Sequence, residues 1–165
     1  IGLSQMRLTR ELDFLNEASN AERCAAQFKG DPHVAVPQIM RDFTSQRILT
    51  MEYFSAPRID NLTALQTMGI SLPNTAAVLT RVFAQMMFVH GFVHCDPHPG
   101  NLLVRWSPEQ PNSCLQLVLL DHGLYREVEE GFRMDYCELW KAMVRRDRPS
   151  LVRVCEKMGV GPYAE

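Results

Sequence analysis

The chain has 165 residues, of which 46% are hydrophobic and 22% are charged, and its formal net charge at pH 7 is -2. This length suits one domain with a core of its own, and the composition excludes both a disordered chain and a membrane bundle. The slight negative charge and the lack of a basic stripe exclude general nucleic-acid binding, so we expect no nucleic-acid partner.

The first part of the chain predicts a helix followed by two strands. Apolar residues recur at helical spacing from Leu3 to Phe28, and the segment Gly30–Pro32 ends that pattern. Alternating apolar residues predict strands over 34–40 and 47–53, which a turn at 42–46 would join as a hairpin.

The rest of the chain predicts more helix than strand. The expected elements are a short helix over 61–68, a long apolar helix over 75–90, strands over 101–106 and 115–121, and helices over about 129–146 and 149–158. Gly91 follows the long helix, and glycine is the residue that most often ends one. This order of elements predicts an α+β fold in two layers.

Five cysteines are spread along the chain, and no two of them form a C-x-x-C pair. An odd number without the spacing of metal ligands predicts reduced thiols rather than a disulfide framework. The chain begins at Ile1 and runs directly into a helical pattern, so we expect it to be a piece of a longer protein.

The segment His94–Asn101, which reads HCDPHPGN, and the later segment LVLLDHG carry the strongest chemical signal. Asp96 lies in a loop after a buried helix, where a carboxylate can orient or accept the proton of a hydroxyl group. Asn101 and Asp121 offer oxygen ligands at the ends of two predicted strands, and such hard ligands suit Mg²⁺. The pattern predicts a phosphoryl-transfer site in which Asp96, Asn101 and Asp121 are catalytic. The last two of these would be the metal ligands.

The same segment has a second interpretation, a metal-dependent hydrolase. His94, Asp96 and His98 form an H-x-D-x-H run, and His122 adjoins Asp121. Pro97 within the run and Pro99 just after it favour a fixed loop over a strand that presents alternate ligands, which makes this interpretation the weaker one. A third interpretation is a pseudokinase-like module that uses the fold for binding without catalysis.

Four segments resemble the UbiB-type atypical kinases, also called AarF-domain-containing or ABC-one kinases. They are ELDFLNEASNAERCA (11–25), RILTMEYFSA (47–56), FVHCDPHPGNLLV (92–104) and LVLLDHGLY (117–125). The resemblance implies a protein-kinase-like fold, with helix C, two strands and the hinge of a partial N-lobe in 1–53. Most of a helical C-lobe would follow in 54–165. DHG in place of the more usual DFG is similar to mitochondrial members outside the coenzyme-Q branch, which implies a mitochondrial location.

The resemblance also implies roles for the residues of the two motifs. Asp96 matches the catalytic-loop aspartate, while Asn101 and Asp121 match the asparagine and the aspartate that bind metal. The implied activity is that of an atypical kinase or ATPase, and the implied cofactors are ATP and Mg²⁺. The implied partners are ATP and, for the full-length protein, a lipid or a membrane surface.

Further roles follow for the first helix and the second strand. Glu11 matches the helix glutamate that pairs with a strand lysine at the α and β phosphates of ATP. Asp13 completes an E-x-D motif, and Glu17 matches a second glutamate that contacts an N-terminal extension. The residues that fall where the hinge would hold adenine through backbone groups are Met51, Glu52 and Tyr53.

The lysine partner of Glu11 is not found ahead of it, because the lysines of the chain are Lys29, Lys141 and Lys157. A glycine-rich or alanine-rich phosphate loop is likewise not seen before the first helix. We therefore expect both parts of the ATP site to lie upstream of Ile1.

On its own, this chain of 165 residues should bind ATP only weakly, because the groups that clamp the phosphates are expected outside it. Isothermal titration calorimetry with ATP and Mg²⁺ measures this affinity directly. Binding in the micromolar range would contradict the expectation and would mean that the chain already contains its phosphate clamp.

Overall fold

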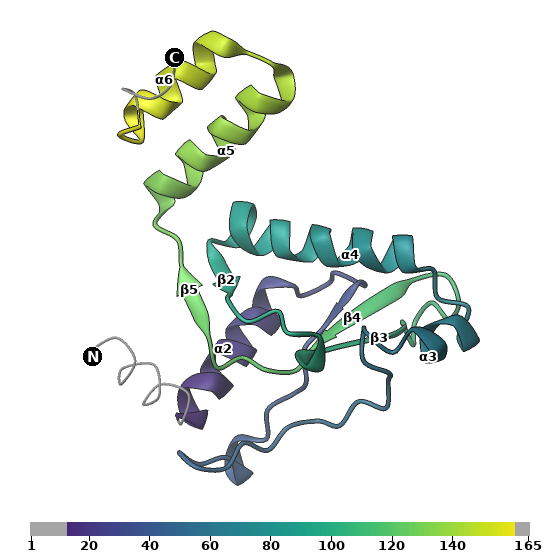
Figure 1. The fold of residues 1–165 in the computed structure, drawn as a ribbon. Helices are drawn as coiled ribbons and strands as arrows, with labels where there is room; N and C mark the ends of the chain where they lie inside the picture. Colours follow the sequence, from purple (N-terminus) through teal and green to yellow (C-terminus); the bar gives the residue numbers. More distant parts are fainter. Residues whose placement is uncertain (1–12, 161–165) are drawn as a thin grey trace. The chain divides into compact units, whose positions relative to one another are not determined.

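The structure is a computed structural model that describes residues 13–160. The described chain divides into two compact units, one formed by 13–83 and 94–126 and the other by 84–93 and 127–160. Figure 1 labels the helices and strands that belong to them. The units combine helices with short strands, so the predicted α+β class is confirmed. Within the described part of the chain, no helix is both long enough and apolar enough to cross a membrane.

Helix α2 (Phe14–Gln27) begins at a cap formed by Asp13. The Asp13 side chain accepts a hydrogen bond from the main-chain N–H of Asn16 at 3.3 Å, and its φ of -105° and ψ of 83° are not helical. The prediction of one continuous helix over 3–28 is wrong at this position, because the backbone turns at the cap. The expected part over 3–12 lies outside the described residues.

A three-stranded sheet in the order β1-β4-β3 forms the centre of the first unit. Strand β4 (Leu115–Leu119) pairs in parallel with β1 (Val34–Ala35) and antiparallel with β3 (Leu102–Trp106). All residues of β4 are buried, as expected for a central strand that is covered on both faces. The two strands predicted for β3 and β4 are confirmed with slightly shorter bounds.

The register of β3 and β4 decides where the predicted metal ligands lie. Leu102 pairs with Leu119, and the main-chain N–H of Leu120 donates to the carbonyl of Asn101 at 3.0 Å. Asn101 and Asp121 therefore emerge from neighbouring strands at the same end of the sheet.

The predicted hairpin of two strands is only partly formed. β1 pairs with β4 instead of with the 47–53 segment. That segment contributes an isolated bridge between Ile39 and Met51 and two main-chain hydrogen bonds beside it, not a continuous ladder. Its neighbourhood offers little packing, since Phe43 is 69% exposed and Ile48 is 61% exposed. An alternating pattern stabilises a strand only where one face of the strand is buried.

The long helix predicted over 75–90 is present with an earlier start. Helix α4 (Leu72–Gln85) continues as the π-helix η2 (Met86–His90). Gly91 then ends it with a φ of 61°, a left-handed conformation that glycine adopts without strain. The predicted role of this glycine is confirmed.

The other α-helices lie close to their predicted positions, and they are α3 (Leu62–Thr67), α5 (Glu130–Arg145) and α6 (Arg148–Lys157). Two single-turn 3₁₀ helices, η1 (Arg41–Phe43) and η3 (Pro99–Asn101), were not predicted and lie where a turn and a loop were expected. Two strands that the sequence did not predict, β2 (Phe92–His94) and β5 (Tyr125–Glu127), form a second small sheet. Each is too short to show a period in the sequence.

Replacing Leu119 with alanine should lower the free energy of unfolding by about 2–5 kcal/mol, because the side chain is fully buried in the central strand and its loss leaves a cavity. Leu62→Ala is the matched control: this leucine is 52% exposed on α3, and its loss should change the free energy by at most about 0.5 kcal/mol. Urea unfolding followed by circular dichroism measures both. Equal effects of the two substitutions would contradict the placement of β4 in the core.

Candidate functional site

The two predicted metal ligands contact one another. Asn101 is the last residue of η3 and immediately precedes β3, while Asp121 follows β4. Nδ2 of Asn101 donates a hydrogen bond to Oδ2 of Asp121 at 3.1 Å. The sheet therefore brings together two side chains that the sequence separates by a loop and two strands.

The arrangement around Asp121 leaves oxygen atoms for a cation. Oδ1 accepts a hydrogen bond from the main-chain N–H of Gly123 at 2.9 Å, and Oδ2 accepts the one from Asn101. A carboxylate has about four acceptor positions, so both oxygens keep capacity. Because Asn101 donates through its nitrogen, its amide oxygen is the acceptor that remains. These residues fit a Mg²⁺ ion, which prefers such oxygen ligands.

Gly123 lies close to the carboxylate that it holds. A Cβ atom at this position would lie 3.3 Å from Oδ1 of Asp121 and 3.7 Å from Oε2 of Glu17. The first distance is tight, so a larger residue would press on the Asp121 carboxylate. Glycine at this position of the DHG segment avoids that tight contact with the Asp121 carboxylate.

The loop that carries Asp96 is organised by two histidines. Nδ1 of His94 accepts a hydrogen bond from the main-chain N–H of Asp96 at 3.0 Å, and Nδ1 of His98 accepts one from Gly100 at 3.0 Å. His94 is buried, whereas Asp96 is exposed. The backbone is therefore held from inside while the carboxylate faces outward.

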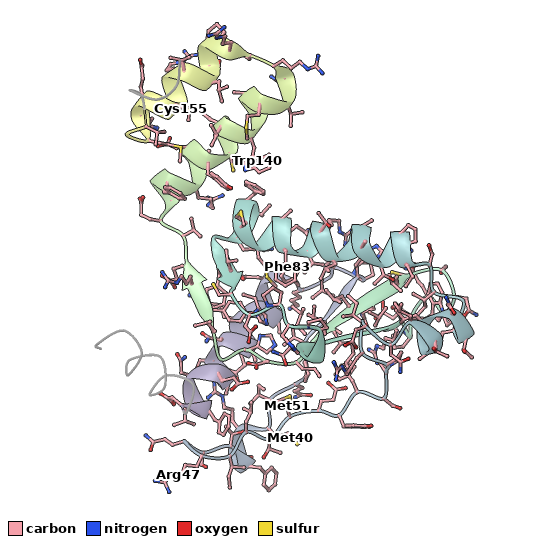
Figure 2. The ribbon with its side chains drawn as sticks, viewed as in Figure 1. Met40, Arg47, Met51, Phe83, Trp140 and Cys155 are labelled. Carbon is pink, nitrogen blue, oxygen red and sulfur yellow. The ribbon has the colours of Figure 1, made fainter. Side chains whose placement is uncertain are left out.

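The charges of Asp96 and Asp121 both act on His94. Burial lowers the pKa of His94, and the charges of Asp121 and Asp96 oppose that shift. Both carboxylates are thus near enough to act on the same imidazole. Phe83 of α4 points inward in Figure 2, and its ring centroid lies 6.0 Å from that of His94. This aromatic contact is part of the burial that lowers the pKa of His94.

The hydrolase interpretation has no geometric support. The Nδ1 atoms of His94 and His98 accept hydrogen bonds from their own loop, so these nitrogens brace the backbone. Over 13–160, no group of three or more His, Cys, Asp or Glu side chains is arranged to hold a metal ion. The pairing of Asn101 with Asp121 is the arrangement that the structure offers instead.

His122 belongs to the buried interior behind the site. Its Nε2 lies 3.0 Å from the carbonyl of Leu119, and its Nδ1 lies 2.9 Å from the hydroxyl of Tyr125. A carbonyl can only accept, so Nε2 carries the hydrogen and Nδ1 accepts from the hydroxyl. Burial lowers the pKa of His122 to about 4, so the ring is neutral near neutral pH. Its role is to anchor the loop that follows Asp121.

Helix α2 contacts the same loop through two side chains. Oε1 of Glu17 accepts a hydrogen bond from the main-chain N–H of His122 at 3.2 Å, and Nδ2 of Asn20 donates to the His122 carbonyl at 2.9 Å. Burial raises the pKa of Glu17, the bond from His122 opposes this, and the charge of Asp121 raises it further. Sequence reasoning assigned no role to Asn20. The only available signal was its place in the segment 11–25, one of the four segments that resemble the family.

Of the two acidic residues that form the E-x-D motif, the structure describes only Asp13. Glu11 lies outside the described residues, so its pairing with a lysine stays a prediction. Asp13 is exposed and caps α2. The cap gives Asp13 a structural role that the sequence did not predict.

The predicted hinge residues lie away from the Asn101–Asp121 pair along the chain. Met51 forms the isolated bridge with Ile39, and the main-chain N–H of Glu52 donates to the carbonyl of Gln38 at 2.9 Å. Tyr53 is 87% exposed. The N–H of Glu52 is thus already bonded within the chain, and adenine binding by this segment stays a prediction.

Comparison with known proteins identifies a family and similar proteins from other organisms. Residues 2–155 match the family described as the ABC1 atypical kinase-like domain. The chain is 44% identical over 165 residues to the probable serine/threonine-protein kinase abkB of Dictyostelium discoideum, covering 100% of this chain and 24% of that protein. It is 38% identical over 158 residues to AarF domain-containing protein kinase 1 of Gallus gallus, covering 96% of this chain and 30% of that protein. The chain thus spans less than a third of the length of these relatives.

A solved structure has a similar fold. The structure of the Rv3197–erythromycin complex from Mycobacterium tuberculosis matches this chain with a TM-score of 0.66 and 19% sequence identity. The match covers 92% of this chain and 36% of that one. Together with the family match, it confirms the predicted kinase-like fold.

Cys95 should react with iodoacetamide before Cys24 and Cys114. Cys95 is exposed next to Asp96, whereas the other two are buried. Burial also raises the pKa of Cys24 to about 11, so the reactive thiolate is scarce at about pH 8. Peptide mass spectrometry after brief alkylation of the native protein measures each site. All three should react equally in urea, and faster labelling of Cys24 in the native protein would contradict the packing of α2.

Proposed function

The chain belongs to the ABC1 atypical kinase-like family, and we propose that it carries the metal-binding and catalytic loops of an ATP-dependent phosphoryl-transfer enzyme. The observation that carries this proposal is the 3.1 Å hydrogen bond that joins Asn101 to Asp121 at one end of the sheet. Relatives named as kinases support the general class of activity. Because the chain spans 24% and 30% of these two proteins, the complete activity is proposed for the full-length protein.

The pair formed by Asn101 and Asp121 would hold Mg²⁺, which would neutralise charge on the phosphates of ATP. Asp96 would accept a hydrogen bond from the attacking hydroxyl group or water molecule. It would thereby direct a lone pair of that oxygen toward the γ-phosphate. Its exposure makes this contact possible without rearrangement of the core.

The loop geometry supports such a role for Asp96. The main-chain N–H of Asp96 is fixed by buried His94, and the following turn is fixed by His98. The prolines on either side of His98 further limit the backbone. A carboxylate on a restrained loop loses little freedom when it orients a reacting oxygen, which is the condition for catalysis by positioning.

Two finer parts of the proposal come from the family resemblance and not from geometry. One is a mitochondrial location of the full-length protein, and the other is a lipid or membrane surface as its partner. Subcellular fractionation tests the first, and flotation with lipid vesicles tests the second.

Asp121→Asn in the full-length protein should lower ATP turnover by about 100-fold or more, because it removes the negative ligand while keeping the shape of the side chain. Phosphate release at saturating Mg²⁺ measures the rate. Asp42→Asn is the matched control, since it makes the same change of charge at an exposed position and should leave the rate as it is. Full turnover by the Asp121 variant would refute the proposed site.

A further inference from the structure

Two side chains of α2 hold a single residue of the loop that follows Asp121. Glu17 accepts a hydrogen bond from the main-chain N–H of His122, and Asn20 donates a hydrogen bond to the main-chain carbonyl of the same residue. Glu17 and Asn20 are three positions apart in the helix, so they lie on one face. Both main-chain polar groups of His122 are therefore bonded to the same helix.

One of these bonds acts on the peptide group that holds the Asp121 carboxylate. The carbonyl of His122 and the N–H of Gly123 belong to the same planar peptide group. On one side this group accepts from Asn20 at 2.9 Å, and on the other it donates to Oδ1 of Asp121 at 2.9 Å. A rotation of this peptide plane would break both hydrogen bonds at once.

The ring of His122 restrains the loop further. It is bonded at Nε2 to the carbonyl of Leu119 and at Nδ1 to the hydroxyl of Tyr125, and it is 2% exposed. The ring thus fixes the position of the residue. The two bonds from α2 fix the orientation of the peptide groups on either side of it.

We propose that Asn20 is a positioning residue for the metal-binding aspartate. By orienting the peptide group between His122 and Gly123, it aims the Gly123 N–H at Asp121 and so sets the direction in which that carboxylate points. The inference rests on the proposed function, because Asp121 is the metal ligand of that proposal. It also makes α2 part of the site, since a displacement of this helix would release the Asp121 carboxylate.

The choice of residue at position 20 agrees with this role. Asparagine has a lower helix propensity than alanine and lies here in the interior of α2. Asn20→Ala should therefore gain helix propensity while it loses one partly buried hydrogen bond. Because these effects oppose one another, the change in global stability should be small, and a loss of metal binding can be separated from unfolding.

The chain offers a matched control on the same helix. Asn16 is exposed, and its hydrogen bond to the Asp13 cap uses the main-chain N–H, which any substitution other than proline keeps. Asn16→Ala therefore makes the same chemical change without touching the loop after Asp121. Asn20→Asp, with Asn16→Asp as its control, keeps the size of the side chain but removes the donor, and it serves as a second variant should the alanine variant fold poorly.

The test uses the full-length protein and two measurements. The first is amide hydrogen exchange over 119–125, where Asn20→Ala should exchange several-fold faster at His122 and Gly123 than the parent, and Asn16→Ala should not. The second is ATP turnover as a function of Mg²⁺ concentration. The Mg²⁺ concentration for half-maximal rate should rise by about 10- to 100-fold in Asn20→Ala, while kcat at saturating Mg²⁺ falls less.

The outcomes separate this inference from the proposed function. Unchanged exchange at His122 and Gly123 overturns the role of Asn20, whatever the rates are. Faster exchange with an unchanged Mg²⁺ requirement also overturns it, because the peptide group would then not govern the carboxylate. If the parent protein turns over no ATP with Mg²⁺, the proposed function fails, and the exchange comparison alone decides whether Asn20 holds the loop.

Discussion

The antiparallel pairing of β3 with the buried strand β4 is the constraint on which the candidate site depends. Because Leu102 lies opposite Leu119, the chain just outside this pair places Asn101 beside Asp121. Burial keeps the register, since a slip by one residue would turn every side chain of the strand to the opposite face. The contact between the two ligands is thus a consequence of the sheet and not of two independent loops.

At the candidate site, Asp96 is exposed and Asn101 and Asp121 are half-buried, while the backbone beside them is held by buried or half-buried side chains. His94 holds the main chain of Asp96, and the pair Glu17 and Asn20 holds that of His122. Neutral buried imidazoles suit this task, because a ring that stays uncharged can bond to the backbone without the cost of burying a charge. Such support is what fixes the geometry of a site before a substrate binds.

Much of the fold could be predicted because it is encoded in local patterns. The apolar run of β4 and the helical spacing of α4 are visible in the sequence, and so is the glycine that ends the latter. The pairing of β1 with β4 could not be predicted, since two residues carry no period and the choice of partner is a tertiary matter. The 47–53 segment shows the reverse case, in which a strand-like pattern has too little to pack against.

The candidate site, like the fold, could be predicted where local sequence patterns encode it. Asn101 and Asp121 stand next to strands, and their residue types already indicated a metal site that the 3.1 Å contact now supports. Asn20 could not be assigned, because its bond to His122 joins residues 102 positions apart and no local spacing encodes it. The roles of Asp96 and of the hinge residues depend on bound ATP, and they stay predictions.

The most direct test of the central claim is a crystal structure of the full-length protein with Mg²⁺ and a non-hydrolysable ATP analogue. The account predicts a Mg²⁺ ion about 2.1 Å from the amide oxygen of Asn101 and from a carboxylate oxygen of Asp121, with Asp96 facing the γ-phosphate. A metal ion bound by other residues, with the Asn101–Asp121 pair turned away from the nucleotide, would contradict it.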